Sequence, residues 1–153
     1  MEKTLVIGVG SVLRSDDGLG VRVIDELQKE KFPPEVKLLS GDISGLELIK
    51  YFPQFQRIII IDAADIKDKP GTVKLFKSSE IKKSDFANIV STHGMTLLET
   101  LTLAEKLDIS SKIIIIGIQP QNTSFGLSLT PEIEEKIPSI VSLVKKVIVS
   151  DKK

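Results

Sequence analysis

Apolar residues in this chain gather in short unbroken runs that alternate with stretches of helical spacing. The runs are rich in β-branched side chains, which predicts buried parallel strands at Thr4–Val9, Val36–Leu39, Arg57–Ile61 and Lys112–Ile118. A fifth segment, Thr72–Phe76, follows the turn signal Pro70-Gly71 and alternates apolar with polar residues. This alternation predicts a strand at the edge of the sheet.

Between the strands, apolar residues recur at the spacing of amphipathic helices. The predicted helices are Leu19–Lys31, Gly45–Phe52, Thr96–Leu107 and Pro131–Val149. Thr130 is the expected N-cap of the last helix, with Pro131 in its first turn. Pro138 falls inside that helix and predicts a kink or a break, while Pro53 is expected to stop the second helix.

Strands that alternate with helices predict an α/β fold. We expect one domain over residues 1–153, with a twisted, five-stranded, mostly parallel sheet and helices on both of its faces, a three-layer α/β/α arrangement. In such sheets ligands bind at the carboxyl ends of the strands. The residues that follow each strand are therefore the first candidates for a functional site.

Composition narrows the function further. Lys plus Arg and Asp plus Glu both number 21, and this balance argues against nucleic-acid binding, which favours a basic excess. The chain has no cysteine, so it offers no thiolate nucleophile or sulfur metal ligand of its own. It begins without the pattern of a signal peptide, and no apolar run approaches the length needed to span a bilayer. We expect a cytoplasmic protein with no membrane insertion.

The loop after the first strand begins Gly-x-Gly, as dinucleotide-binding turns do. Residues 8–20 read GVGSVLRSDDGLG, and the third glycine of the nucleotide fingerprint is replaced by Leu13. Asp42, soon after the second strand, could imitate the ribose-binding acid of that fold. However, Asp16 and Asp17 stand where a pyrophosphate needs positive potential, which makes nucleotide binding the weaker interpretation.

The adjacent acids Asp16 and Asp17 need another explanation. Two carboxylates on a glycine-bounded loop repel each other, and a cation would relieve that repulsion. An aspartate before a helix commonly caps it. We expect one of the two to cap the following helix and the other to face the site.

Asp62 and His93 complete the candidate site. Asp62 follows four consecutive isoleucines, where burial disfavours its charge, and His93 is the only histidine in the chain. Two carboxylates and one imidazole form an incomplete site for nickel, zinc, iron or manganese. Such a site should bind a free soft metal poorly but could bind a metal carried on the thiolates of another protein.

Other hydrolase types fit less well. A Ser–His–Asp hydrolase could use Ser91 near His93, but the chain has no G-x-S-x-G elbow. Zinc protease motifs such as H-E-x-x-H need two histidines, and the chain has one.

Four segments of the chain resemble the hydrogenase maturation endopeptidases, which trim the large-subunit precursor of nickel–iron hydrogenases. They occur in the same order as in that family and cover most of the chain. They are GVGSVLRSDDGLG at 8–20, RIIIIDAAD at 57–65, STHGM at 91–95 and IIGIQPQ at 115–121. The last two most resemble the branch that serves membrane-associated, hydrogen-evolving hydrogenases.

The resemblance assigns the metal-recognition residues of the family to Asp17, Asp62 and His93. It makes Asp16 the acid that precedes this set, and Asp42 and Gln119 further candidates for contact with the substrate. The chain departs from the family pattern at Ser11, where asparagine is usual, and in the order Ser40-Gly41-Asp42 after the second strand.

The resemblance also implies an activity. The expected reaction is one cleavage that removes the C-terminal extension of the precursor, by an enzyme with no tightly bound cofactor and with nickel carried by the substrate. We also expect the enzyme to be a monomer. Either the nickel assists the hydrolysis or the acids cleave in the manner of an aspartic protease. A nickel-sensing chaperone without catalytic activity is the alternative from another class.

Overall fold

The computed structural model describes residues 2–43, 45–77, 90–91 and 97–150. Five strands form the main sheet in the order β2-β1-β3-β6-β4. Neighbouring strands are parallel except for β4, which pairs antiparallel with β6 at one edge. A short sixth strand, β5, pairs with the end of β3. The strands are β1 (Thr4–Val9), β2 (Val36–Gly41), β3 (Arg57–Asp65), β4 (Val73–Lys77), β5 (Val90–Ser91) and β6 (Lys112–Ile118).

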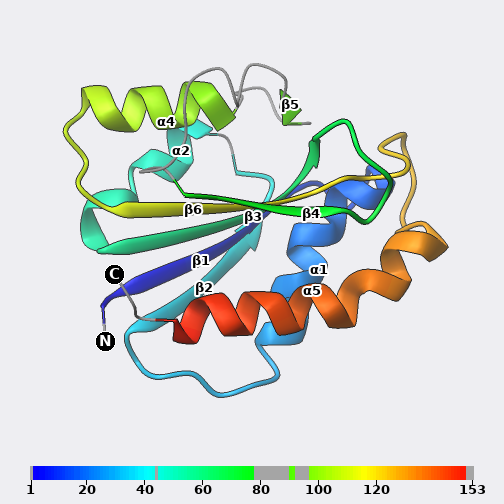
Figure 1. Ribbon diagram of the computed structural model, residues 1–153, viewed down its shortest axis with the longest axis horizontal. Helices are drawn as coiled ribbons and strands as arrows, with labels where there is room; N and C mark the ends of the chain where they lie inside the picture. The colour runs from blue at the N-terminus through cyan, green and yellow to red at the C-terminus, as the bar shows by residue number, and fades with distance from the viewer. Residues whose placement is uncertain (1, 44, 78–89, 92–96, 151–153) are drawn as a thin grey trace.

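Helices cover both faces of this sheet. In Figure 1, α1 and α5 lie against one face, and α2 and α4 lie against the other. The α-helices are α1 (Leu19–Leu27), α2 (Gly45–Ile49), α4 (Leu97–Lys106) and α5 (Pro131–Val149), and the short 3₁₀ helices are η1 (Ser15–Gly18) and η2 (Phe52–Gln54). The predicted α/β fold, with five main strands between two layers of helices, is therefore confirmed.

The unbroken apolar runs bury both faces of the central strands. In β3, Ile59 and Ile61 pack with α1 and α5, whereas Ile58 and Ile60 pack in the second core on the side of α2. Successive side chains of a strand point to opposite faces, so a strand covered on both sides needs apolar residues at every position. This requirement explains the runs of isoleucine in β3 and β6.

Some predicted boundaries are wrong. The strand expected to end at Ile61 continues to Asp65, partly because its end pairs with β5, a strand that the sequence did not predict. The second helix, expected over Gly45–Phe52, ends at Ile49, and Pro53 lies in the first turn of η2, where its missing N–H costs nothing. The helix α5 runs through Pro138 without a break. Thr130 is its N-cap, as predicted.

Arg57 fixes the other end of α5. Its buried guanidinium donates hydrogen bonds to the carbonyl oxygens of Val147, Ile148 and Ser150, and to the hydroxyl of Thr4. A cation at a helix C-terminus is stabilised by carbonyl groups that lack partners within the helix.

No helix among the described residues is both long and apolar enough to cross a membrane.

A two-pronged ion pair joins α1 to the first turn of α5. Arg22 donates to both carboxylate oxygens of Glu134, at 2.7 and 2.6 Å. The hydrogen bond from Arg22 holds the pKa of Glu134 below its ordinary value. Both side chains are more than a third exposed, at 38% and 47%, so water and salt screen the pair.

We therefore expect Glu134→Gln to lower the free energy of unfolding by only about 0.5 kcal/mol at neutral pH. Because the folded state depresses this pKa, the stabilisation is present above the unfolded-state pKa and is lost as the pH falls through the folded-state value. Urea unfolding of wild type and variant should therefore converge in acid. Glu135→Gln makes the same change of charge one residue further along α5 and is the control. A difference between wild type and Glu134→Gln that persists unchanged in acid would contradict the assignment.

Candidate functional site

The turn that carries Asp17 lies directly against the carboxyl ends of β1 and β3. Gly20, in the first turn of α1, is so close that a Cβ there would lie 2.7 Å from the carbonyl oxygens of both Val9 and Ile61. Because Asp62 follows Ile61 in β3, this approach places η1, with Asp17, beside the strand end that carries Asp62. The structure therefore places the backbone of this turn at the carboxyl edge of the sheet.

The glycines of the first loop permit this approach. A Cβ at Gly8 would lie 2.1 Å from the carbonyl oxygen of Gly20, and one at Gly10 would lie 1.9 Å from that of Asp17. The Gly-x-Gly pattern therefore lets the backbone of η1 and α1 pack on β1. That role accounts for the glycines without a bound phosphate, so the geometry gives no support to the nucleotide interpretation.

We predict that Gly8→Ala strongly destabilises the fold, by about 3 kcal/mol, the upper part of the usual range for overpacking. The added methyl group would overlap a backbone carbonyl, which cannot turn aside as a flexible side chain can. Urea unfolding measures the effect. Gly117→Ala in β6 is the matched control, because its Cβ would make ordinary contacts, with the nearest atom at 3.6 Å. Equal losses in the two variants would show that close packing at Gly8 is not the cause.

Asp17 and Asp62 are both buried carboxylates. Asp17 is completely buried in η1, where the backbone N–H of Ser11 donates to its Oδ2 at 3.0 Å. Asp62 is 2% exposed. Alternation along β3 places it on the same face of the sheet as Ile60 and Ala64, the face of α2 and α4. Burial disfavours the charged form of a carboxylate, so a cation that approaches this edge of the sheet would stabilise both.

Asp16 has a different task. Its completely buried carboxylate accepts hydrogen bonds from the backbone N–H groups of Gln121, Asn122 and Thr130, and from the hydroxyl of Thr130. It therefore ties the loop after β1 to the loop between β6 and α5. The expected side-chain cap on α1 is wrong for both acids, since the N-cap of that helix is Gly18. Contact between Asp16 and a substrate stays a prediction.

Gln119 organises the loop that leaves β3. Its side-chain oxygen accepts a hydrogen bond from the N–H of Ile66 at 2.8 Å. Nearby, the backbone N–H of Lys67 donates to the carboxylate of Asp65 and lowers the pKa of Asp65. Gln119 is half-buried at the end of β6, and whether it also contacts a substrate stays a prediction.

Asp42 is exposed at the end of β2. The N–H of Gly10 donates to the carbonyl oxygen of Gly41, so Asp42 follows a residue bonded to the Asp17-bearing loop. Its predicted substrate contact is compatible with this position but stays a prediction.

His93 lies outside the residues that the structure describes. Within the described ranges, no group of three or more histidine, cysteine, aspartate or glutamate side chains is arranged to hold a metal ion. That Asp17, Asp62 and His93 form one site therefore stays a prediction. Of the three, the structure describes only Asp17 and Asp62, both at the carboxyl edge of the sheet.

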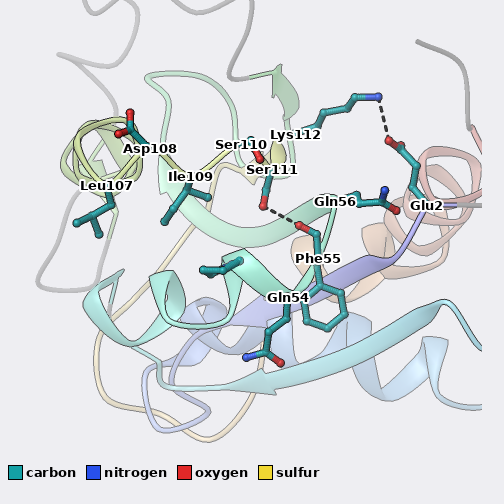
Figure 2. A pocket seen from close by; sticks show the side chains of 11 residues that line it. Glu2, Gln54, Phe55, Gln56, Leu107, Asp108, Ile109, Ser110, Ser111 and Lys112 are labelled. Carbon is teal, nitrogen blue, oxygen red and sulfur yellow. Dashed lines mark hydrogen bonds and ion pairs between the residues drawn. The ribbon is translucent and has the colours of Figure 1, made fainter.

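A spacious hollow lies at the opposite end of the strands. It has a volume of about 540 Å³ and is lined by residues next to the starts of β3 and β6, among them Gln56 and Ser111. Figure 2 shows the hydroxyl of Ser111 directed at the carbonyl oxygen of Phe55, and Lys112 paired with Glu2. None of the predicted site residues lines this hollow.

Sequence reasoning missed the loop of residues 121–130 as part of the site's framework. The motif IIGIQPQ reaches only its first residue, Gln121, and the partners of the loop, Arg14, Ser15 and Asp16, come from the other end of the chain. The one signal available was its composition, since no charged residue occurs between Pro120 and Pro131.

Comparison with known proteins agrees with the fold. The family model described as "Hydrogenase maturation protease" matches residues 21–147. The hydrogenase expression/formation protein HupD of Bradyrhizobium diazoefficiens is 32% identical over 149 residues, which cover 95% of this chain and 78% of that protein. The hydrogenase 2 maturation protease of Escherichia coli is 30% identical over 138 residues, covering 88% of this chain and 84% of that protein.

Solved structures give the same result. The hydrogenase maturating endopeptidase HybD from Escherichia coli superposes with a TM-score of 0.82 at 27% identity. The match covers 95% of this chain and 91% of that one.

Proposed function

The chain belongs to the hydrogenase maturation protease family, and from that premise we propose that it removes the C-terminal extension of a nickel-loaded hydrogenase large-subunit precursor. Family membership makes the chain a peptidase. The finer proposal is that Asp17, Asp62 and His93 recognise nickel held by the substrate. The observation that carries it is the placement of two buried carboxylates at one edge of the sheet.

The electrostatics of this edge favour a cation that arrives with the substrate. Asp17 and Asp62 are almost fully removed from water, and a positive charge close to a buried carboxylate stabilises its charged form. The chain has no cysteine, so the soft ligands that nickel also accepts would come from the precursor. The enzyme would then hold the precursor only after its metal is in place.

Two roles for the acids follow from the same placement. In the first, Asp17 and Asp62 bind the substrate's nickel and so position the scissile peptide bond near a water molecule. In the second, the acids themselves catalyse the hydrolysis, as in an aspartic protease, and one carboxylate takes a proton from the attacking water. Both roles require the two side chains at the same edge of the sheet.

The test is incubation of the wild-type protein with nickel-loaded and nickel-free precursor, followed by measurement of intact mass. We expect a mass loss equal to the C-terminal extension with the loaded precursor only. The variant His93→Ala should lose this preference or the reaction itself. If His93→Ala cleaves both precursors at the wild-type rate, the nickel-recognition proposal is wrong.

The same measurement addresses the alternative of a nickel-sensing chaperone. A chaperone would bind the loaded precursor without changing its mass. Binding without cleavage by the wild-type protein, under conditions in which a related maturation protease cleaves its own precursor, would therefore favour the chaperone over the proposed reaction.

A further inference from the structure

Exposed apolar side chains concentrate on two loops beside the candidate site. Seven large hydrophobic residues are exposed in the described part of the chain, and four of them are Val12, Leu13, Phe125 and Leu127. Phe125 is 83% and Leu127 is 76% exposed. We call these four residues the apolar platform. Scattered exposed hydrophobics are ordinary, but a cluster indicates an interaction surface.

The two loops that carry the platform are bonded to each other. The N–H of Gly126 donates to the carbonyl oxygen of Leu13, and the N–H of Ser15 donates to that of Gly126, both at 2.9 Å. Arg14 Nε donates to the carbonyl oxygen of Thr123, and Ser15 Oγ to that of Ser124. The exposed side chains therefore stand on a fixed backbone, so little conformational entropy is lost when a partner binds.

A hollow of about 250 Å³ opens beside the platform. Val12 and Leu127 line it together with Val21 and Leu129, and the Arg22–Glu134 ion pair lies at its polar side. Its apolar part suits one aliphatic side chain, while Arg22, Asp25 and Glu134 give the rest of the lining a charged character. Pockets next to exposed apolar residues commonly receive the anchoring side chain of a protein partner.

The two segments that carry the platform contain no charged side chain. Residues 8–13 and 121–130 contain no charged side chain, although 27% of the whole chain is charged. Between them, Arg14 is engaged with Thr123. The two segments therefore suit an apolar partner surface, whereas the charged side chains near the platform lie beside the hollow, at Arg22, Asp25 and Glu134.

The platform is continuous with the candidate site. Val12 and Leu13 belong to the loop that connects β1 to η1, the same loop in which Ser11 holds Asp17. In Figure 1 the second loop, between β6 and α5, lies at the same end of the sheet as the start of α1. A protein bound on the platform would therefore reach the edge that carries Asp17 and Asp62.

We propose that the apolar platform docks an uncharged, apolar surface segment of the protein substrate, with one of its side chains in the hollow beside Val12 and Leu127. This inference rests on the proposed function, because it takes the hydrogenase precursor as the substrate. It adds a docking surface outside the reacting groups, which would contribute to substrate affinity and leave the chemical step unchanged.

The experiment compares two double variants. The platform variant carries Phe125→Ser and Leu127→Ser, and the matched control variant carries Leu107→Ser and Val149→Ser. The control residues are also exposed and apolar, at 56% and 63%, but lie at the ends of α4 and α5 away from the platform. Cleavage of the nickel-loaded precursor is followed by intact mass over a range of precursor concentrations. Thermal unfolding checks that all proteins remain folded.

We expect the platform variant to raise KM about tenfold or more with kcat unchanged, and the control variant to match the wild type. Equal KM values for the platform variant and the wild type overturn the docking proposal. A wild type that does not cleave the precursor at all contradicts the proposed function instead, so the two failures are distinguishable.

Two other occupants of the platform are tested with the same proteins. If sedimentation shows that the wild type self-associates and the platform variant does not, the surface pairs two copies of the chain and the docking proposal is wrong. If the wild type but not the variant sediments with vesicles of phosphatidylcholine and phosphatidylglycerol, while KM is unchanged, the surface binds lipid instead.

Discussion

Asp17→Asn is expected to slow cleavage of the nickel-loaded precursor by at least about a hundredfold, while the free energy of unfolding changes little. The loss follows because the carboxamide has no negative charge with which to attract a metal ion or to accept a proton. The fold should tolerate the change, since the amide oxygen of asparagine can still accept the N–H of Ser11. Asp62→Asn should behave in the same way at the end of β3.

The measurement is the rate of mass loss of the precursor at a concentration well below KM, with urea unfolding of each variant alongside. Asp108→Asn is the matched control, because it makes the same change of charge at an exposed aspartate beside the hollow at the opposite end of the strands. We expect the control to cleave at the wild-type rate. Full activity of Asp17→Asn would remove Asp17 from the reaction and from nickel recognition.

The fold was predictable because its strands are buried on both faces. Unbroken runs such as Arg57–Ile61 and Lys112–Ile118 can be satisfied only between two layers of helices. The errors fall where local sequence has little influence. The strand β3 extends past Ile61 because residues from a distant segment pair with its end, and α5 tolerates Pro138 without a break.

The candidate site was predictable in part. The rule that parallel strands end at one edge was enough to bring Asp17 and Asp62 together. The sequence could not show that Asp16 holds the loop of residues 121–130 whereas Asp17 does not, because the partners of Asp16 lie 105 or more residues later in the chain. Likewise, Gly8 and Gly10 resemble a phosphate loop in sequence, and only the distance to Gly20 and Asp17 reveals that they serve close packing.

This division leads to the prediction with the largest expected effect on stability. Asp16→Ala should lower the free energy of unfolding by about 4 kcal/mol or more. The substitution removes the completely buried carboxylate that accepts hydrogen bonds from three backbone N–H groups and the hydroxyl of Thr130. These bonds are part-buried, so each lost acceptor is expected to cost about 1 kcal/mol, the lower end of the range for a buried group. Asp25→Ala, which removes an exposed carboxylate from α1, is the control and should change stability by less than about 0.5 kcal/mol.

The effect of Asp16→Ala should also spread to substrate binding. The carboxylate holds residues 121, 122 and 130, which frame the segment bearing Phe125 and Leu127, so its loss would release one half of the apolar platform. At a temperature at which the variant is still folded, we expect KM for the precursor to rise while Asp17 keeps its own contact with Ser11. Hydrogen exchange at residues 121–130 should be faster in the variant than in the wild type, whereas exchange in α1 should change less. If the variant instead loses kcat with KM unchanged, Asp16 acts directly in the reaction and the structural role assigned to it is wrong.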